Sequence, residues 1–193
     1  MTENPLNQEE LQNLSDSNFW LHFRNASKKI DELLEETQTQ FWKINQGLSP
    51  ILPSAAYRGK ISRGNNHEGF PYLVLDCPNH YTTKDTFAFR VMVWWGKHIT
   101  IGLHLEGHSF HKLKDSVLLA SLAKDYWQNA SNNPWTHQKE GYKKADWEPA
   151  SDFSFLRLVQ FYDLSEINQL TDLSINLYQD LFIPLHESLK ADR

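Results

Sequence analysis

Three histidines lie within eight positions of the stretch "GLHLEGHSFHKL" (residues 102–113): His104, His108 and His111. Imidazole is a common metal ligand, so this spacing raises the question of a metal site. Zinc requires three or four converging nitrogen, sulfur or oxygen ligands, and the sequence contains no HExxH motif and no Cys–His cluster to complete such a set. We therefore expect no bound metal and no other cofactor, with these three histidines as the only candidate ligands.

A second group of candidate residues comes from the segment "DTFAFRVMVWWGKHITIGLHLEG" (85–107), which has the pattern of a β-hairpin. All odd positions of 87–95 and of 99–105 are apolar. Successive side chains of a strand point to opposite faces, so both odd sets are predicted to face the core. A three-residue loop of Gly96, Lys97 and His98 would place the two sets on the same face.

This register predicts the contents of the other face. The expected cross-strand pairs are Trp94 with Thr100, Met92 with Gly102, Arg90 with His104, and Ala88 with Glu106. Gly102 would then leave an open floor beside Arg90, Met92, Trp94 and His104, which outlines a pocket for a small anionic or planar ligand. The alternative is purely structural: a partly covered face on which an arginine–glutamate pair holds a loop.

A catalytic interpretation of the same face is also open. Arg90 would hold an anionic substrate, His104 would be the general acid or base, and Glu106 or Asp76 would orient it. In either interpretation two neighbouring cations repel each other, so a carboxylate or a bound anion should lie within hydrogen-bond distance of Arg90. Cys77 is a weaker candidate, because a lone cysteine at a strand end more often packs than reacts.

These residues need a scaffold. Apolar residues spaced three and four apart predict a helix over 16–46, capped by Ser15 or Asp16 and ended by Gly47 and the following prolines. Its apolar stripe could pack on the sheet or pair with a second copy, so we leave open a monomer or a homodimer. Further elements are a sheet core at about 55–106, a helix at about 114–128, a long loop at 129–152 that could act as a lid, a strand at 153–163, and a helix at 165–189 that Pro184 bends or interrupts.

The order of these elements is α-β-β-β-β-α-β-α. Short connections between successive strands favour antiparallel pairing. We predict one domain spanning residues 1–193 with an α+β fold, in which an antiparallel four- to five-stranded sheet carries helices packed mainly on one face.

Composition and charge limit the function. The net charge of −5 argues against a nucleic-acid binder, although residues 55–114 carry eight basic and four acidic side chains, which suits a small anion. No apolar run approaches the roughly 18 residues that a membrane span needs. Cys77 is the single cysteine, which excludes an internal disulfide and fits the reducing cytoplasm.

Four short motifs of this sequence are similar to those of a known group of proteins. The sequence contains a Pro-Tyr-Leu-x-Leu-Asp strand (71–76), an Ala-Phe-Arg segment leading to Trp-Trp-Gly (88–96), a Leu-His-Leu strand (103–105) and a late Asn-Pro-Trp (133–135). Over roughly residues 55–138 the chain resembles a family of small bacterial proteins of unknown function, mainly from Bacteroidota. The resemblance implies a cytoplasmic bacterial protein and adds nothing on activity. We expect a non-enzymatic binding or interaction protein, with the small enzyme acting on an anionic substrate as the alternative.

Overall fold

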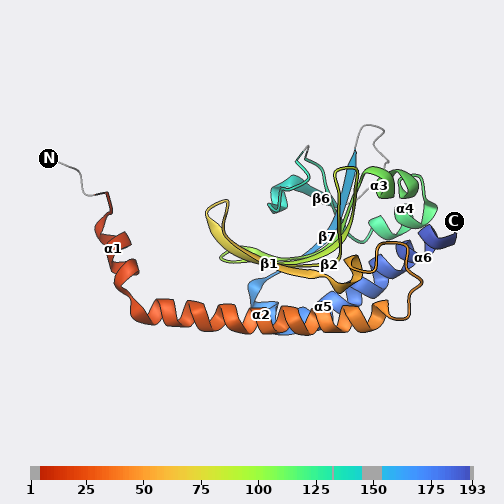
Figure 1. Cartoon of the computed structure of the whole chain (residues 1–193). Coiled ribbons are helices and arrows are strands. Elements are labelled where there is room, and N and C mark those ends of the chain that lie inside the picture. Colours follow the sequence, from red (N-terminus) through yellow and green to blue (C-terminus); the bar gives the residue numbers. More distant parts are fainter. Residues whose placement is uncertain (1–4, 132, 145–153, 192–193) are drawn as a thin grey trace.

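A single curved sheet organises the molecule (Figure 1). The computed structural model describes residues 5–131, 133–144 and 154–191. Within them, seven antiparallel strands are arranged in the order β1-β2-β3-β4-β7-β5-β6. The strands are β1 (Lys60–His67), β2 (Phe70–Tyr81), β3 (Asp85–Trp94), β4 (His98–Glu106), β5 (Trp127–Asn129), β6 (Tyr142–Lys144) and β7 (Phe155–Tyr162). The predicted α+β class with an antiparallel sheet is confirmed.

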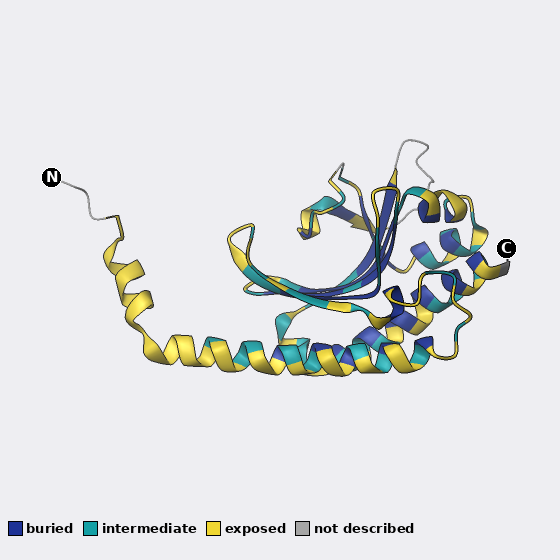
Figure 2. Cartoon of the chain, in the orientation of Figure 1, coloured by how far each residue is buried: buried dark blue, intermediate teal, exposed yellow. Residues whose placement is uncertain are grey.

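The helices lie mainly against the convex side of the sheet and at one end of it (Figures 1 and 2). They are α1 (Gln8–Ser15), α2 (Ser17–Asn45), α3 (Gly107–Leu113), α4 (Val117–Ala123), α5 (Leu170–Leu177) and α6 (Ile183–Ala191), with short helical turns η1 (Ala56–Arg58), η2 (Lys139–Gly141), η3 (Leu164–Gln169) and η4 (Tyr178–Phe182). The described residues contain no helix that is both long and apolar enough to cross a membrane.

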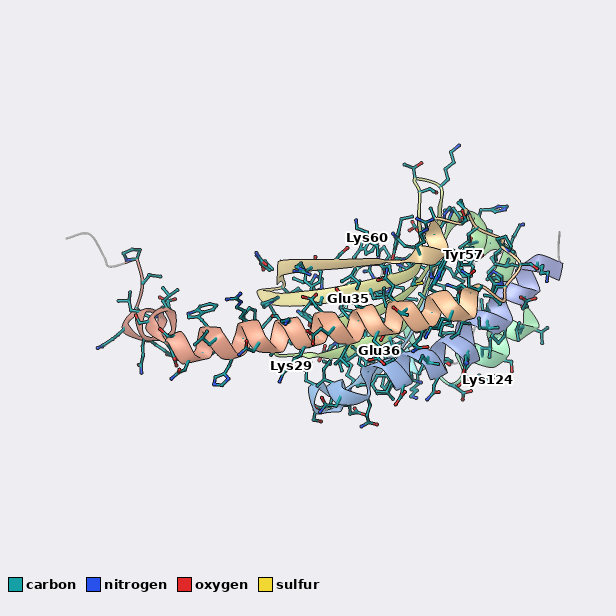
Figure 3. All side chains as sticks on the ribbon, turned by 60° about the horizontal axis from the view of Figure 1, so that its bottom comes forward. Lys29, Glu35, Glu36, Tyr57, Lys60 and Lys124 are labelled. Carbon is teal, nitrogen blue, oxygen red and sulfur yellow. The ribbon has the colours of Figure 1, made fainter. Side chains whose placement is uncertain are left out.

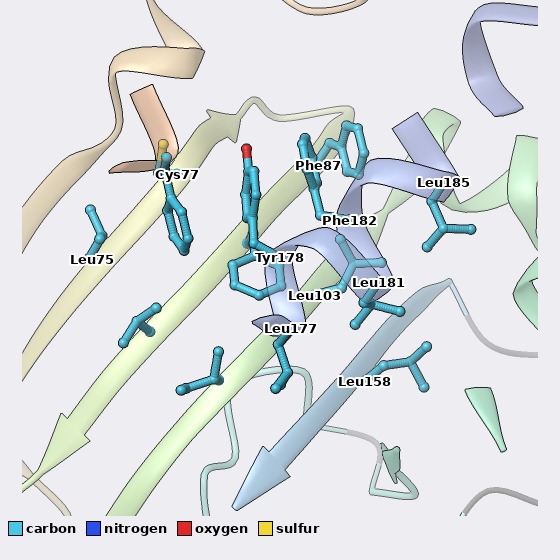
Figure 4. Close-up of a cluster of buried hydrophobic side chains, with 14 of the residues drawn as sticks. Leu75, Cys77, Phe87, Leu103, Leu158, Leu177, Tyr178, Leu181, Phe182 and Leu185 are labelled. Atoms are coloured by element: carbon cyan, nitrogen blue, oxygen red, sulfur yellow. The ribbon is translucent and has the colours of Figure 1, made fainter. Parts of the chain in front are cut away.

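Both apolar sets of the β3–β4 hairpin face the main core, as predicted. Phe87, Phe89, Val91 and Val93 on β3 are buried there, and so are Ile99, Ile101, Leu103 and Leu105 on β4. They pack against the helices of the convex side, where the ring of Tyr178 stacks on Phe41 with a centroid distance of 4.1 Å. Figure 4 shows this contact region, with Leu75 and Cys77 at one side and the η4 and α6 residues at the other.

The register of the hairpin is different from the prediction. Trp94 pairs with His98, Met92 with Thr100, Arg90 with Gly102, Ala88 with His104, and Thr86 with Glu106. Each partner is therefore two residues away from the expected one, and the loop is Trp95–Lys97, with Gly96 at a φ of +67°. Strand parity is the same in registers that differ by two residues, so the apolar pattern could not separate them.

Gly102 does not form an open floor. A methyl group added at Gly102 would collide with the backbone of β7, at the carbonyl oxygen of Leu158 and at the Cα of Val159. Gly102 pairs with Val159, so the absent side chain lets β7 approach β4 closely on the concave side. The glycine therefore serves the close approach of β7 to β4 rather than a ligand.

Several predicted elements differ in detail. The four- to five-strand sheet has seven strands because β5 and β6 are three residues long, too short to show a period in the sequence. The predicted helix 114–128 is shortened to α4 and is followed by the start of β5. The predicted loop 129–152 contains η2 and β6, with 132 and 145–152 outside the described residues. The sheet core predicted at about 55–106 begins with η1, and its first strand, β1, starts at Lys60.

The two end helices follow the sequence more closely. Asp16 caps α2 by accepting hydrogen bonds from the backbone N–H groups of Asn18 (2.9 Å) and Phe19 (3.0 Å). Near the C-terminus, the helical run predicted at 165–189 is interrupted by η4, a π-helical turn that ends two residues before Pro184. Proline lacks the N–H that a regular helix would use at that position, so the irregularity lies close to where it was expected.

Candidate functional site

The concave side of the sheet holds a cavity of about 270 Å³. Strands β1, β2 and β3 form its floor, and the segment between β5 and β6 forms one wall. Its lining residues are Ser62, His67, Tyr72, Val74, Asp76, Arg90, Met92, Trp135 and His137. We refer to this cavity, together with the buried residues His104 and Arg157 and the half-buried His98 around it, as the concave site.

Arg90 is held by a carboxylate in this cavity. Its Nε donates to Asp76 Oδ1 at 2.7 Å and its Nη2 to Asp76 Oδ2 at 2.9 Å, a two-point contact. Tyr81 Oη donates to Asp76 Oδ1 and accepts from Arg90 Nη2, each at 3.1 Å. Burial alone would lower the pKa of the Arg90 guanidinium, but the bonds to Asp76 and Tyr81 outweigh it and raise the pKa.

The expected carboxylate near Arg90 is therefore Asp76. It lies directly opposite Arg90 on the neighbouring strand β2. Glu106 lies four residues beyond the partner of Arg90 on β4, as the residue before α3, and within the described residues it makes no hydrogen bond to Arg90 or His104. The expected Arg90–His104 pairing is wrong, since Arg90 faces Gly102 and His104 faces Ala88.

His104 is buried without a hydrogen-bond partner. The residue is only 1% exposed, and neither Nδ1 nor Nε2 of its ring has a partner among the described residues. Trp135 covers it, with ring centroids 5.1 Å apart and the rings nearly perpendicular. Burial, and then the charges of Arg157 and Arg90, lower the pKa of His104 to about 2, so its ring is neutral at physiological pH.

Arg157 is a residue that the sequence analysis missed. It lies on β7 opposite His104 and is 2% exposed. Its Nη1 donates to the carbonyl oxygens of Pro134 (3.0 Å) and Thr136 (2.9 Å), and its Nη2 lies 3.2 Å from Nδ1 of His137. Among the described residues no carboxylate pairs with Arg157 and its Nε has no partner, and burial lowers the pKa of the guanidinium.

Further imidazoles complete the concave site. The rings of His67 and His137 are 5.0 Å apart, and Nε2 of His67 is buried without a partner. His98 Nε2 lies 3.0 Å from the carbonyl oxygen of His137. Burial lowers the pKa values of both His98 and His137, in the latter case together with the charges of Arg157 and Arg90. The rings of His98 and His137 are therefore neutral at pH 7, and each offers one donor and one acceptor nitrogen.

The segment that crosses the concave face lies inside the loop predicted as a lid. Trp135 lies over Arg90, with the guanidinium carbon 5.6 Å from the ring centroid, and is still 46% exposed. Tyr142 is buried beside Arg157, at 5.9 Å, whereas Lys143 and Lys144 are exposed. The tryptophan that shields the site thus comes from the motif Asn-Pro-Trp (133–135).

The remaining candidates have other positions. Met92 lines the cavity, and Trp94 packs with it and with Val74 in a small second apolar cluster. His108 and His111 are exposed on α3, away from the buried His104. In the described part of the chain, no three histidine, cysteine, aspartate or glutamate side chains converge as metal ligands would.

Cys77 is buried, and burial raises the pKa of its thiol to about 12. The thiol donates to the carbonyl oxygen of Tyr57 at 3.4 Å. A thiol held in its protonated form by apolar surroundings is a poor nucleophile, so Cys77 belongs to the core.

Comparison with models of protein families, with curated proteins and with solved structures finds no match in any of the three. The resemblance to the bacterial family therefore stays a prediction, and the function has to be argued from the site itself.

Proposed function

We propose that this chain is a non-enzymatic binding protein that holds a small anionic or planar ligand in the concave site. One observation carries the proposal: four buried nitrogen atoms of this site have no hydrogen-bond partner among the described residues. They are His67 Nε2, both ring nitrogens of His104, and Arg157 Nε. Buried polar atoms are paired in the large majority of cases, so a cluster of unpaired ones next to a cavity indicates a missing partner.

The charged residues of the site indicate the sign of the charge that the missing partner carries. Among the described residues the site contains the cations Arg90 and Arg157 and the single carboxylate Asp76, which Arg90 already engages. An anionic group would therefore balance a buried positive charge that has no other counterion. The ring of Trp135 and the imidazoles give flat contact surfaces, and about 270 Å³ is close to the lower end of the range for small-molecule pockets.

The enzyme alternative has less support. A general base needs a pKa near the working pH, and the pKa of His104 is lowered to about 2. Neither Asp76 nor Glu106 is hydrogen-bonded to His104 to orient its ring, since both of its nitrogens lack a partner in the described part of the chain. The proposal also places the protein in a bacterial cytoplasm, which rests on the single Cys77 and on the family resemblance.

Thermal denaturation tests the proposal. The full chain is melted with inorganic phosphate, sulfate, acetate, benzoate and adenosine monophosphate, and native mass spectrometry of the purified protein reports any small molecule that stays bound. A ligand at 100 times its dissociation constant stabilises a protein by about 2.7 kcal/mol, which is easily measured.

Two matched variants localise the effect. His67→Ala removes a ring that lines the cavity, and His111→Ala removes an exposed ring on α3. We expect stabilisation by an anion to be lost in the first variant and retained in the second. A chain that carries no small molecule and whose melting responds to none of the anions would contradict the proposal.

A further inference from the structure

The N-terminal part of the chain is helical but makes few contacts with the rest of the described chain. We call α1 and the first turns of α2, residues 8–29, the arm. None of residues 5–29 is buried, and the arm projects past the ends of the strands (Figures 2 and 3). Its large apolar side chains are exposed: Leu11 47%, Leu14 56%, Phe19 51%, Trp20 45% and Leu21 55%. Contiguous apolar surface of this kind is rare in monomers and marks interaction sites.

Local bonds give the arm a defined shape. Asn7 and Glu10 cap the start of α1 reciprocally, and Asp16 caps α2 at the bend between the helices. Trp20 Nε1 donates to the carbonyl oxygen of Leu14 at 3.2 Å, across that bend. These contacts hold α1 away from the body of its own chain. Within the described residues, the leucines of α1 are therefore not buried against the sheet or against the other helices of the same chain.

A groove lies where the arm meets the sheet. It has a volume of about 270 Å³, and its apolar lining includes Phe23 of α2, Tyr72 and Leu73 of β2, and Trp95 of the β3–β4 loop. The rings of Phe23 and Trp95 are 4.8 Å apart. Arg24 and Arg63 also line the groove.

The charges of the arm are divided between its two halves. Residues 5–16 contain Glu9, Glu10 and Asp16 and no basic residue, whereas residues 17–30 contain Arg24, Lys28 and Lys29 and no acidic one. When two such arms lie antiparallel, the acidic half of each meets the basic half of the other. Parallel arms would place like charges together, so the charge pattern favours an antiparallel arrangement of the two copies.

We propose that two copies of this chain form a homodimer through their arms. Each α1 lies in the groove of the other copy, with Leu11 and Leu14 against Phe23 and Trp95. Phe19 and Trp20 of both copies lie near the two-fold axis. This inference concerns a groove that shares only Tyr72 with the lining of the concave site, and it does not depend on the proposed ligand.

Sedimentation analysis of the full chain over a concentration series tests the dimer. We expect a dimer for the parent and a monomer for the double variant Leu11→Glu/Leu14→Glu. Val117→Glu is the matched control, because Val117 is an apolar residue on α4 that is 85% exposed and lies outside the arm. It should remain dimeric. Circular dichroism checks that all variants melt like the parent at low concentration, as expected for residues that contact no core.

Charge reversal tests the orientation. Glu9→Lys/Glu10→Lys should weaken the dimer by roughly tenfold in dissociation constant, and so should Arg24→Glu/Lys29→Glu. Combining all four changes should restore the affinity, since each acidic half again meets a basic half. Failure of the combined variant to recover would overturn the antiparallel arrangement.

The rival occupant of this surface is a membrane. A parent chain that is monomeric throughout the series would overturn the proposal. Co-sedimentation of that monomer with vesicles of phosphatidylcholine and phosphatidylglycerol would then assign the arm to a lipid surface. The variant Leu11→Glu/Leu14→Glu should lose the dimer but keep any stabilisation by anions. The arm dimer and the ligand site are therefore tested independently of each other.

Discussion

Arg90 and Arg157 lie on the same face of the sheet but are held in different ways. Arg90 has a full two-point contact with Asp76, whereas Arg157 is bound by carbonyl oxygens and a neutral ring. A buried ion pair is costly to break from one side, because the remaining charge loses its partner. Arg90 is therefore both part of the cavity wall and a structural residue.

This double role can be measured at Arg90. We expect Arg90→Met to lower the free energy of unfolding by about 3–5 kcal/mol, because Asp76 would be left buried and unpaired. The double variant Arg90→Met/Asp76→Leu should recover most of the loss, since no uncompensated charge remains. Urea unfolding of the parent, both single variants and the double variant gives the coupling. An Arg90→Met protein as stable as the parent would show that the pair is not structural.

His104 predicts a pH dependence of stability. Its pKa is lowered to about 2 in the folded chain, against about 6.5 in an unfolded one. Between these values the unfolded state binds the extra proton, so the free energy of unfolding falls as the pH is lowered from 6.5. Replacing His104 with Gln should reduce this slope by up to about 1.4 kcal/mol per pH unit.

The matched control for His104→Gln is His111→Gln, on the exposed surface of α3. It should leave the slope unchanged. His98 and His137, whose pKa values are also lowered, maintain part of the acid sensitivity in both variants. Urea unfolding at pH 7, 6, 5 and 4.5 gives the slopes, and equal slopes for the parent and His104→Gln would contradict a neutral buried ring.

At the scale of elements, the concave site depends on how closely β7 approaches β4. Gly102 permits this approach because no side chain stands between the strands. β7 then places Arg157 beside His104, and the segment before β6 places Trp135 over both Arg90 and His104. The site thus combines residues of β1, β2, β3, β4 and β7 with the segment between β5 and β6.

Gly102→Ala tests this dependence. We expect a loss of about 1–3 kcal/mol or more in the free energy of unfolding, because the added methyl group must displace the backbone of β7. Gly47→Ala is the control, since a methyl group there meets one backbone atom at 3.5 Å, an ordinary contact. Equal stability of Gly102→Ala and the parent would show that β7 can shift without cost.

The same elements show what the sequence could predict. Alternation of apolar residues identified the faces of β3 and β4, because side-chain direction in a strand has a strict period of two. It could not fix the register, which is set by the turn around Gly96. Arg90, Met92 and His104 were recognised because they share one face of the predicted hairpin. Asp76 was recognised as one of the carboxylates nearest to them in sequence.

Arg157, His67 and His137 were not recognised. Arg157 interrupts an apolar strand in "FLRLVQF" (155–161), which is a local signal of a polar group on the second face. Its relevance emerges only when β7 pairs with β4, a contact between segments about fifty residues apart. His67 ends β1 and His137 lies in the segment between β5 and β6, and no short sequence pattern encodes their contact.

At the scale of the whole molecule, the buried second half of α2 contrasts with the exposed arm. The second half of α2 packs on the sheet through Ile30, Leu34, Thr37 and Phe41, whereas the arm continues the same apolar stripe beyond the end of the sheet. The sequence predicted one continuous stripe and left open whether it packs on the sheet or on a second copy. In the structure its C-terminal half packs on the sheet, and the arm dimer is our proposal for the other half.

Amide hydrogen exchange can separate these two parts in one experiment. In a monomer, residues 8–29 should exchange quickly, because a helix with few tertiary contacts opens locally, while residues 34–45 should be protected by the core. If the arms pair, protection of residues 8–29 should rise with protein concentration, and protection of residues 34–45 should stay constant. The variant Leu11→Glu/Leu14→Glu should abolish the concentration dependence without exposing the core. Arm amides that exchange equally fast at every concentration would show that the arm has no partner in solution.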